Sequence, residues 1–189
     1  MNSDKRIKSQ LMDADDIERT LNRMTQQIIE MLDPDDPHPR LALVGMQSRG
    51  VYLAQRLRDK IMATEGLAIE FGMLDVTMYR DDFRHRLTQP TIRKTDILFD
   101  VNGCHIVLVD DVLYTGRTAR SGLEALLDLG RPASVRFLVM IDRGLRELPV
   151  SADIFGRFVP TTKFEGIRVR LREYDAEEGV WLVENAPAT

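Results

Sequence analysis

The first part of the chain places its hydrophobic residues at helical spacing. Steps of three and four separate the apolar positions, which predicts an amphipathic helix of about five turns. These positions are Ile17, Leu21, Met24, Ile28 and Met31. Asp13 is the expected N-cap, and Asp15 and Asp16 suit the positive end of the helix dipole. Pro34 and Pro37 follow and end the helix, because proline cannot continue the hydrogen-bond ladder.

Short apolar runs alternate with two further helical patterns in the rest of the chain. The expected strands cover residues 41–44, 69–76, 97–99, 106–109, 135–141, 154–159, 167–171 and 180–183. A helix with apolar positions from Val51 to Ile61 is expected to stop at Gly66. Another helix is expected to end at Gly130, with an apolar side made of Leu123, Leu126, Leu127 and Leu129. The alternation predicts one α/β domain over residues 1–189 with a mostly parallel central sheet flanked by helices.

Two segments lack a core pattern. Residues 80–94 are strongly charged and lie between the expected strands at residues 69–76 and 97–99, so we expect a flexible hairpin arm over residues 80–95. An oligomer contact or a plain solvated hairpin is the alternative for this segment. Residues 1–12 are polar at their start and are expected to form a disordered tail.

Composition narrows the class of protein without identifying it. The chain has 189 residues and a formal net charge of −4, so it has no bulk attraction for nucleic acid and would need a local basic face to bind it. Cys104 is the only cysteine, which excludes an internal disulfide and argues against a zinc site. The chain shows neither a signal peptide nor an apolar run long enough to span a membrane. We therefore predict a cytoplasmic protein without a membrane partner.

The candidate chemistry lies where the strand at residues 106–109 ends. Asp110 and Asp111 follow this strand, and a short loop then opens a helix. Ligands of open α/β sheets bind at the carboxyl ends of strands, where two carboxylates can bind sugar hydroxyls directly or through hydrated Mg²⁺. Residues 115–118, Thr-Gly-Arg-Thr, offer hydroxyls and backbone N–H groups at a helix N-terminus, which suits a phosphate. The alternative is a buried strand that simply meets a turn, with Asp111 as an N-cap.

Residues 106–118 resemble the signature of the type I phosphoribosyltransferases, which bind 5-phosphoribosyl 1-diphosphate. The resemblance implies the fold of that family, with a flexible arm and a small hood. It also implies that Asp110 and Asp111 contact the ribose hydroxyls, with Mg²⁺ carried by the substrate and held in part by these acids. The loop that binds the substrate would run through Val112, Leu113, Tyr114, Thr115, Gly116, Arg117 and Thr118.

Three other segments resemble parts of the same family. Residues 44–50 resemble its diphosphate loop, which assigns substrate binding to Ser48, Arg49 and Gly50. Residues 78–82 resemble the root of the arm and would bring Arg80 to the diphosphate. Residues 141–149 follow the next strand, where the family recognises the base, here with Ile141, Asp142 and Arg143. A surface salt bridge from Arg143 to Asp142 or Glu147 is the alternative.

Together the segments resemble the pyrimidine operon attenuation regulators that have uracil phosphoribosyltransferase activity. The implied reaction converts uracil and phosphoribosyl diphosphate into UMP and diphosphate, with Asp110, Asp111, Arg49 and Arg80 as the catalytic set. The 6-oxopurine branch carries a carboxylate just before the Thr-Gly pair, where this chain has Tyr114. Tyr114 therefore disfavours a purine as the base.

The resemblance also implies binding of a leader mRNA by a basic face formed across a dimer. The candidate residues are Arg19, Arg23, Arg146, Arg157 and Lys163. Gln26, Met31 and Ser151 depart from the pattern of RNA-binding members, and ordinary solvation explains scattered arginines equally well. Two alternatives stay open: a salvage enzyme for another base, and a UMP-sensing RNA regulator with negligible catalysis. Ile29 and Leu32 widen the apolar stripe of the first helix, in keeping with a homodimer or a larger homo-oligomer.

Overall fold

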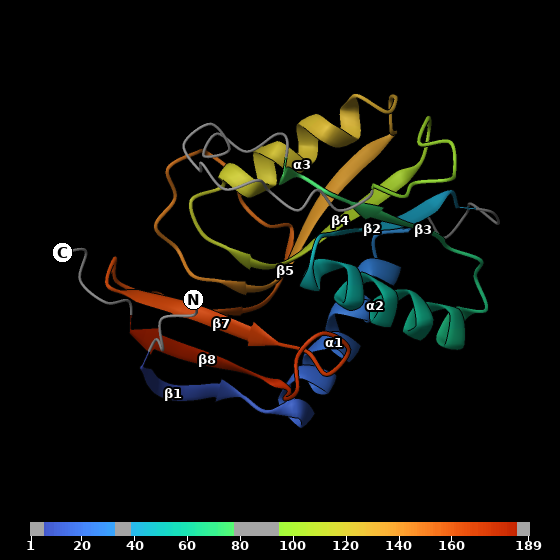
Figure 1. Cartoon of the computed structure of the whole chain (residues 1–189). Helices are drawn as coiled ribbons and strands as arrows, with labels where there is room; N and C mark the ends of the chain where they lie inside the picture. The colour runs from blue at the N-terminus through green and yellow to red at the C-terminus, as the bar shows by residue number, and fades with distance from the viewer. Residues whose placement is uncertain (1–5, 33–38, 78–94, 185–189) are drawn as a thin grey trace.

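The computed structural model describes residues 6–32, 39–77 and 95–184 and contains two sheets (Figure 1). Every strand pair in the central sheet is parallel. Its spatial order is β3 (Glu70–Leu74), β2 (Leu41–Met46), β4 (His105–Leu113), β5 (Ser134–Asp142) and β6 (Ile154–Phe158). The second sheet is antiparallel, and we call it the hood. Its order is β1 (Ile7–Met12), β8 (Gly179–Glu184) and β7 (Glu165–Arg170).

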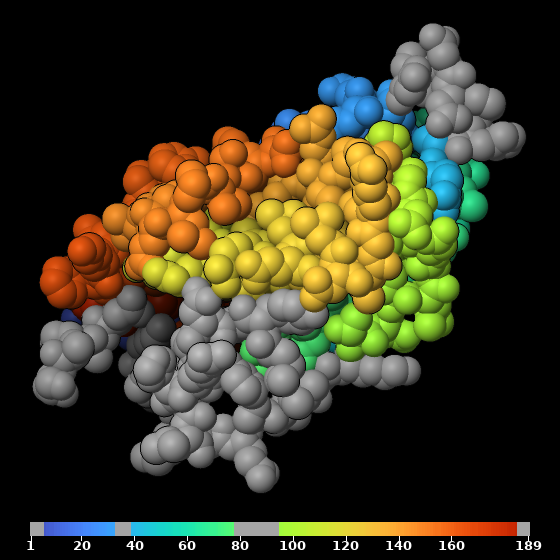
Figure 2. All heavy atoms as spheres, turned by 90° about the horizontal axis from the view of Figure 1, so that it is seen from above, coloured from blue at the N-terminus to red at the C-terminus, as the bar shows by residue number. Residues whose placement is uncertain are grey.

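Helices cover both faces of the central sheet. Alternate residues of a strand point to opposite faces, and each face has its own core. Leu43 and Val107 pack with α1 (Ala14–Ile29) and α2 (Arg49–Glu65). Val44 and Leu108 pack on the other face, where α3 (Arg117–Leu127) lies. In Figure 2, α3 (yellow) crosses the middle of this second face. The predicted parallel sheet with flanking helices is confirmed.

Two of the expected helix ends are confirmed, at Asp13 and Gly66, whereas α3 ends at Leu127 and not at Gly130. Asp13 caps α1: its Oδ1 accepts a hydrogen bond from the backbone N of Asp16 at 2.7 Å, and Asp16 Oδ2 accepts one from the backbone N of Asp13 at 3.3 Å. This reciprocal capping satisfies two N–H groups that the helix cannot bond internally. Gly66 ends α2 in the left-handed region, at φ 66°. Cys104 is buried beside β4.

Other expectations are wrong. Met31 lies beyond the end of α1 and is 46% exposed, so it is not part of the buried side of that helix. Residues 7–12 are not a disordered tail but form β1, which pairs with β8. Residues 97–99 form no strand; the adjacent Asp96 makes a single antiparallel bridge with Met73. Leu127 and Leu129 do not belong to the buried side of α3, since they are 55% and 47% exposed. The expected arm lies mostly outside the described residues, as does Arg80. No helix in the described ranges is long and apolar enough to cross a bilayer.

Candidate active site

Three of the predicted segments meet at one edge of the central sheet. Parallel strands end at the same edge, so the segments that follow β2, β4 and β5 come together there. The register places Gly45 of β2 opposite Val109, and Leu113 of β4 opposite Asp142. The diphosphate loop (residues 47–50), the acid pair (Asp110 and Asp111) and the base segment (residues 141–143) are therefore neighbours.

The acid pair lies within the last residues of β4. Asp110 is buried, and its Oδ1 accepts a hydrogen bond from the backbone N of Asp111 at 2.9 Å. Removal from water is the largest influence on the Asp111 carboxyl and raises its pKa, while the positive charge of Arg49 acts in the opposite direction. A carboxylate in this position gains from a cation or from hydroxyl donors placed against it. The donor set therefore fits both ribose hydroxyls and a hydrated Mg²⁺.

The phosphate loop (residues 112–118) turns sharply into α3. Gly116 is the N-cap of α3 and has φ 90°, a conformation that glycine adopts at little cost. A Cβ at this position would lie 3.3 Å from Val150 Cβ and 3.4 Å from Leu148 Cβ. The carbonyl oxygen of Thr115 accepts hydrogen bonds from the backbone N atoms of Glu147 and Leu148, at 2.9 and 3.0 Å. The segment after β5 thus fixes the loop so that the N-terminus of α3 faces the edge of the sheet.

Arg143 supports the phosphate loop from the side of the base segment. It is buried, and its guanidinium carbon lies 4.0 Å from the centroid of the Tyr114 ring. Its Nε donates to Thr161 Oγ1 at 2.8 Å, and its Nη2 donates to the carbonyl oxygens of Thr162 and Glu165 at 3.2 and 2.6 Å. Burial lowers the pKa of Arg143 from its ordinary value. The contacts of Arg143 therefore join the base segment, the phosphate loop and the hood.

Arg146 makes a second connection to the phosphate loop. Its Nη1 donates to the carbonyl oxygen of Tyr114 at 2.8 Å, and its Nε donates to that of Val150 at 2.9 Å. Its Nη2 binds Asp142 Oδ2 at 2.5 Å, while Asp142 Oδ1 accepts a hydrogen bond from the backbone N of Gly144. Asp142 therefore pairs with Arg146, and the alternative salt bridge from Arg143 to Asp142 or Glu147 is not formed. RNA contact by Arg146 stays a prediction, since its contacts here are internal.

The diphosphate loop runs from the end of β2 into the first turn of α2. Ser48 is the N-cap of α2, and the backbone N of Gln47 donates to the carbonyl oxygen of Leu74 at 2.9 Å. Gly50 packs directly on β4, because a Cβ there would lie 2.4 Å from the carbonyl oxygen of Val109. Arg49 binds Asp175 through Nε at 2.9 Å and Nη2 at 2.7 Å. Sequence reasoning missed Asp175, which is 126 residues away and stands in an ordinary charged loop.

The other candidates for RNA contact lie around α1 and β6. The Nη2 of Arg23 donates to the carbonyl oxygen of Gly156 at 2.5 Å, and Arg157 donates to that of Leu11 at 2.5 Å. Arg19 pairs with Asp16 of its own helix at 2.7 Å, and Lys163 is exposed. Arg23 thus fastens α1 to β6, and Arg157 fastens β6 to β1. In the part of the chain that the structure describes, no group of three His, Cys, Asp or Glu side chains forms a protein-only metal site.

Comparison with known proteins defines the class. Residues 8–173 match the phosphoribosyl transferase domain family. A hypoxanthine phosphoribosyltransferase from Staphylococcus aureus superimposes with a TM-score of 0.68 at 19% identity, covering 96% of this chain and 94% of that one. The Trypanosoma cruzi hypoxanthine phosphoribosyltransferase gives 0.70 at 19% identity, covering 96% of each chain. The chain therefore belongs to the phosphoribosyltransferase family, and the predicted type I fold is confirmed.

Sequence relatives narrow the class to one group. A protein from Pelotomaculum thermopropionicum is 48% identical over 181 residues, covering 96% of this chain and 98% of the relative. Those from Elusimicrobium minutum and Thermus thermophilus are each 46% identical, covering 92% and 97% of this chain and 95% and 99% of the relatives. All three are named bifunctional protein PyrR. Within the phosphoribosyltransferases, this chain belongs to the PyrR proteins, as its motifs predicted.

Proposed function

We propose that this protein transfers the phosphoribosyl group of 5-phosphoribosyl 1-diphosphate to uracil and releases diphosphate. The observation that carries the proposal is the meeting of the acid pair, the phosphate loop and the diphosphate loop at one edge of a parallel sheet. Membership of the PyrR group supports a pyrimidine as the acceptor. Tyr114 supports it further, because it replaces the carboxylate of the 6-oxopurine branch and its ring lies against Arg143.

In this proposal each loop binds one part of the substrate. Asp110 and Asp111 accept hydrogen bonds from the ribose hydroxyls, and the backbone N–H groups at the start of α3 bind the 5-phosphate. Arg49 and the backbone of Ser48 and Gly50 bind the diphosphate, with Arg80 as a further candidate. Ribosyl transfer passes through a cation-like sugar, so the protein contributes positioning and charge stabilisation. Mg²⁺, arriving with the substrate and held in part by the acid pair, would neutralise the departing diphosphate.

Recognition of the base falls to residues 141–143. The Asp142 carboxylate is bound by Arg146, and the Arg143 guanidinium by the hood-side carbonyl groups. In this proposal these two side chains shape and stiffen the base site. Contacts to uracil would then come chiefly from the backbone of the segment.

A second function, regulation of pyrimidine genes through leader mRNA, is proposed from membership of a group named bifunctional. UMP would occupy the same site and favour RNA binding. Arg19, Arg23, Arg157 and Lys163 are the candidates for RNA contact, together with Arg146. We also propose a homo-oligomer, because Phe155 and Phe158 of the edge strand β6 are 43% and 55% exposed and a second copy would cover them. Light scattering on purified protein tests the oligomer.

The decisive experiment offers phosphoribosyl diphosphate with uracil, hypoxanthine, guanine or orotate, with and without Mg²⁺. We expect UMP from uracil alone, dependence on Mg²⁺, and loss of product in Asp111→Ala. Formation of another nucleotide would favour salvage of that base. Tight UMP binding without product from any base would contradict catalysis, and UMP-dependent retardation of a pyrimidine leader RNA in gels would then support the regulator alone.

A further inference from the structure

One face of α2 carries three residues that contact the hood loop, the segment between β7 and β8 at residues 171–178. Arg49, Tyr52 and Arg56 stand at steps of three and four, so they lie on the same side of the helix. Arg49 binds Asp175, Tyr52 lies against Tyr174 with ring centroids 6.1 Å apart, and Arg56 binds Glu173. The hood loop is therefore seated along the first two turns of α2, and its contact with Arg49 lies at the end next to the acid pair.

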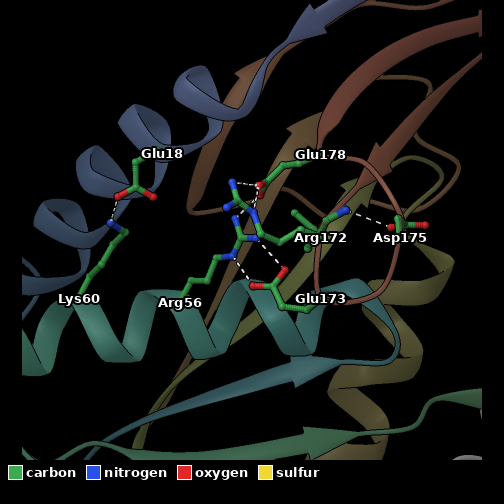
Figure 3. Close-up of polar contacts among 8 residues, drawn as sticks. Glu18, Arg56, Lys60, Arg172, Glu173, Asp175 and Glu178 are labelled. Carbon is green, nitrogen blue, oxygen red and sulfur yellow. Dashed lines mark hydrogen bonds and ion pairs between the residues drawn. The ribbon is translucent and has the colours of Figure 1, made fainter.

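Charged pairs anchor the loop at the Arg56 end. Arg56 Nε and Nη2 bind the two carboxylate oxygens of Glu173, each at 2.7 Å, and its Nη1 binds Glu178. Arg172 binds the other oxygen of Glu178 at 2.5 Å. The side chains of Glu178 and Arg56 are 6% and 18% exposed, so the pair that these two residues form is largely shielded from solvent. Figure 3 shows these side chains meeting between α2 and the loop, with Lys60 and Glu18 joining α2 to α1 nearby.

Asp175 is also held in place by contacts other than the one with Arg49. Its Oδ2 accepts a hydrogen bond from the backbone N of Leu171 at 3.0 Å, and its own backbone N donates to the Leu171 carbonyl oxygen at 2.7 Å. Burial is the largest influence on the Asp175 carboxyl and would raise its pKa. The hydrogen bonds from Arg49 and Leu171, together with the positive charges of Arg49 and Arg170, outweigh burial, so the pKa lies below its ordinary value. Asp175 is thus an ionised, fixed acceptor.

The contact holds the Arg49 side chain in one orientation. Asp175 takes hydrogen bonds from Nε and Nη2, and the ring of Tyr174 lies 5.1 Å from the guanidinium carbon. Arginine has five N–H donors, so the bidentate pair leaves others for a second anion. An arginine side chain that is already ordered loses less conformational freedom when it binds a ligand. Without Asp175, the charge of Asp111 would be a competing attraction, since Arg49 and Asp111 already influence each other electrostatically.

We propose that Asp175 is a positioning residue, which holds Arg49 in the orientation that binds the diphosphate of phosphoribosyl diphosphate. This inference rests on the proposed function, because it assigns a role within the same substrate site. Asp175 acts through Arg49 and need not touch the substrate. The hood would then contribute to substrate affinity through one carboxylate on its loop.

Asp175→Asn is the informative variant. Its side-chain carbonyl can still accept from Leu171, which preserves the turn, whereas the charged bidentate pair with Arg49 is lost. We expect affinity for Mg²⁺-phosphoribosyl diphosphate, measured by calorimetry without uracil, to fall about tenfold, the size of one hydrogen bond to a charged group. In turnover, KM for phosphoribosyl diphosphate should rise by a similar factor while KM for uracil stays unchanged. Glu177→Gln is the matched control, since Glu177 is on the same loop but pairs with Arg170 at the surface.

A double-variant cycle separates positioning from a general loosening of the loop. In an Arg49→Met background, Asp175→Asn should cause no further loss of affinity, because its effect passes through Arg49. An equal loss in both backgrounds, or unchanged or tighter binding in Asp175→Asn with a wild-type melting temperature, would overturn the positioning role alone. Failure of the wild-type protein to bind phosphoribosyl diphosphate would overturn the proposed function and this inference with it.

Discussion

Alanine at Gly50 should move α2 away from the strand that carries the acid pair. The added Cβ would lie 2.4 Å from the Val109 carbonyl oxygen and 3.1 Å from Asp110 Cα. Non-bonded heavy atoms prefer separations of about 3.5 Å, so helix and strand must part by about 1 Å. The position of a Cβ is fixed by the backbone and the atoms that it meets are backbone, so no side-chain rotation can relieve the clash.

Two free-energy terms of opposite sign decide the stability of Gly50→Ala. Alanine improves helix propensity by about 1 kcal/mol, whereas overpacking of this kind costs about 1–3 kcal/mol and more when backbone must shift. We expect a net loss of about 2 kcal/mol, which lowers Tm by roughly 4–8 °C for a chain of this size. A displacement of about 1 Å between diphosphate loop and acid pair should also reduce turnover by roughly a hundredfold.

Thermal unfolding and phosphoribosyl transfer, measured on the same preparations, test this reasoning. Gly66→Asn is the control, because Gly66 caps the other end of α2 with φ 66°, has open space around it, and asparagine tolerates that conformation. The control should keep both Tm and activity. Gly50→Ala protein with a wild-type or higher Tm would refute the packing argument. A lowered Tm with full activity would refute the link between this contact and the site.

Three further predictions concern the supports of the site. Arg146→Met removes the hydrogen bonds to Tyr114, Val150 and Asp142, and it should weaken UMP binding at least tenfold in calorimetry; unchanged affinity would contradict its role in holding the phosphate loop. Arg56→Met leaves Glu173 and Glu178 without this partner and should cost about 3 kcal/mol in urea unfolding; a loss below about 1 kcal/mol would show that the pairing does not anchor the hood loop. The hydrogen bond from Lys8 is the largest of several influences, which include hydrogen bonds from Thr162, and together they lower the pKa of Glu165 from 4.5 to about 2. The stabilisation from this carboxylate is therefore complete above pH 4.5 and lost as pH falls toward 2. The unfolding free energy of Glu165→Gln should thus decline less steeply than that of the wild type over this interval. Equal slopes would contradict the lowered pKa of Glu165.

The local sequence pattern predicted the elements whose burial shows in the order of their own apolar and polar residues. β2, β4 and β5 are continuous apolar runs because both of their faces are covered, and α1 shows its period because only one side is buried. β1 gave no such signal, since five of its residues are exposed or half-buried and its partner β8 comes from the far end of the chain. The apolar run at residues 97–99 led to the opposite error, a predicted strand that is not formed. Ile97 is apolar because it packs over Gly72, whereas the next residue, Leu98, is 89% exposed.

In the candidate site, too, features that are local in sequence could be predicted, and contacts between distant segments could not. The acid pair and the Thr-Gly turn are adjacent in sequence, so their chemistry could be recognised before the fold was known. The contacts of Arg143 and Arg146 could not be, because most of their acceptors are backbone carbonyl oxygens, which leave no mark in a sequence. Asp175 was missed because a single aspartate in a charged loop has no local pattern that points to Arg49.

The pairing of β1 with β8 has a consequence for how the protein is made. Among the described residues β1 is the first strand in chain order and β8 the last. Because β8 is the centre of the hood, β1 and β7 each depend on it for their hydrogen-bond ladder. On a ribosome, the central sheet can assemble while β8 is still being translated, but the hood cannot. Chains that stop before residue 179 would contain nearly the whole central core and the acid pair. They would lack β8, the strand that follows the Asp175 loop and pairs with both β1 and β7. Synthesis of residues 179–184 is thereby required before the hood can be completed.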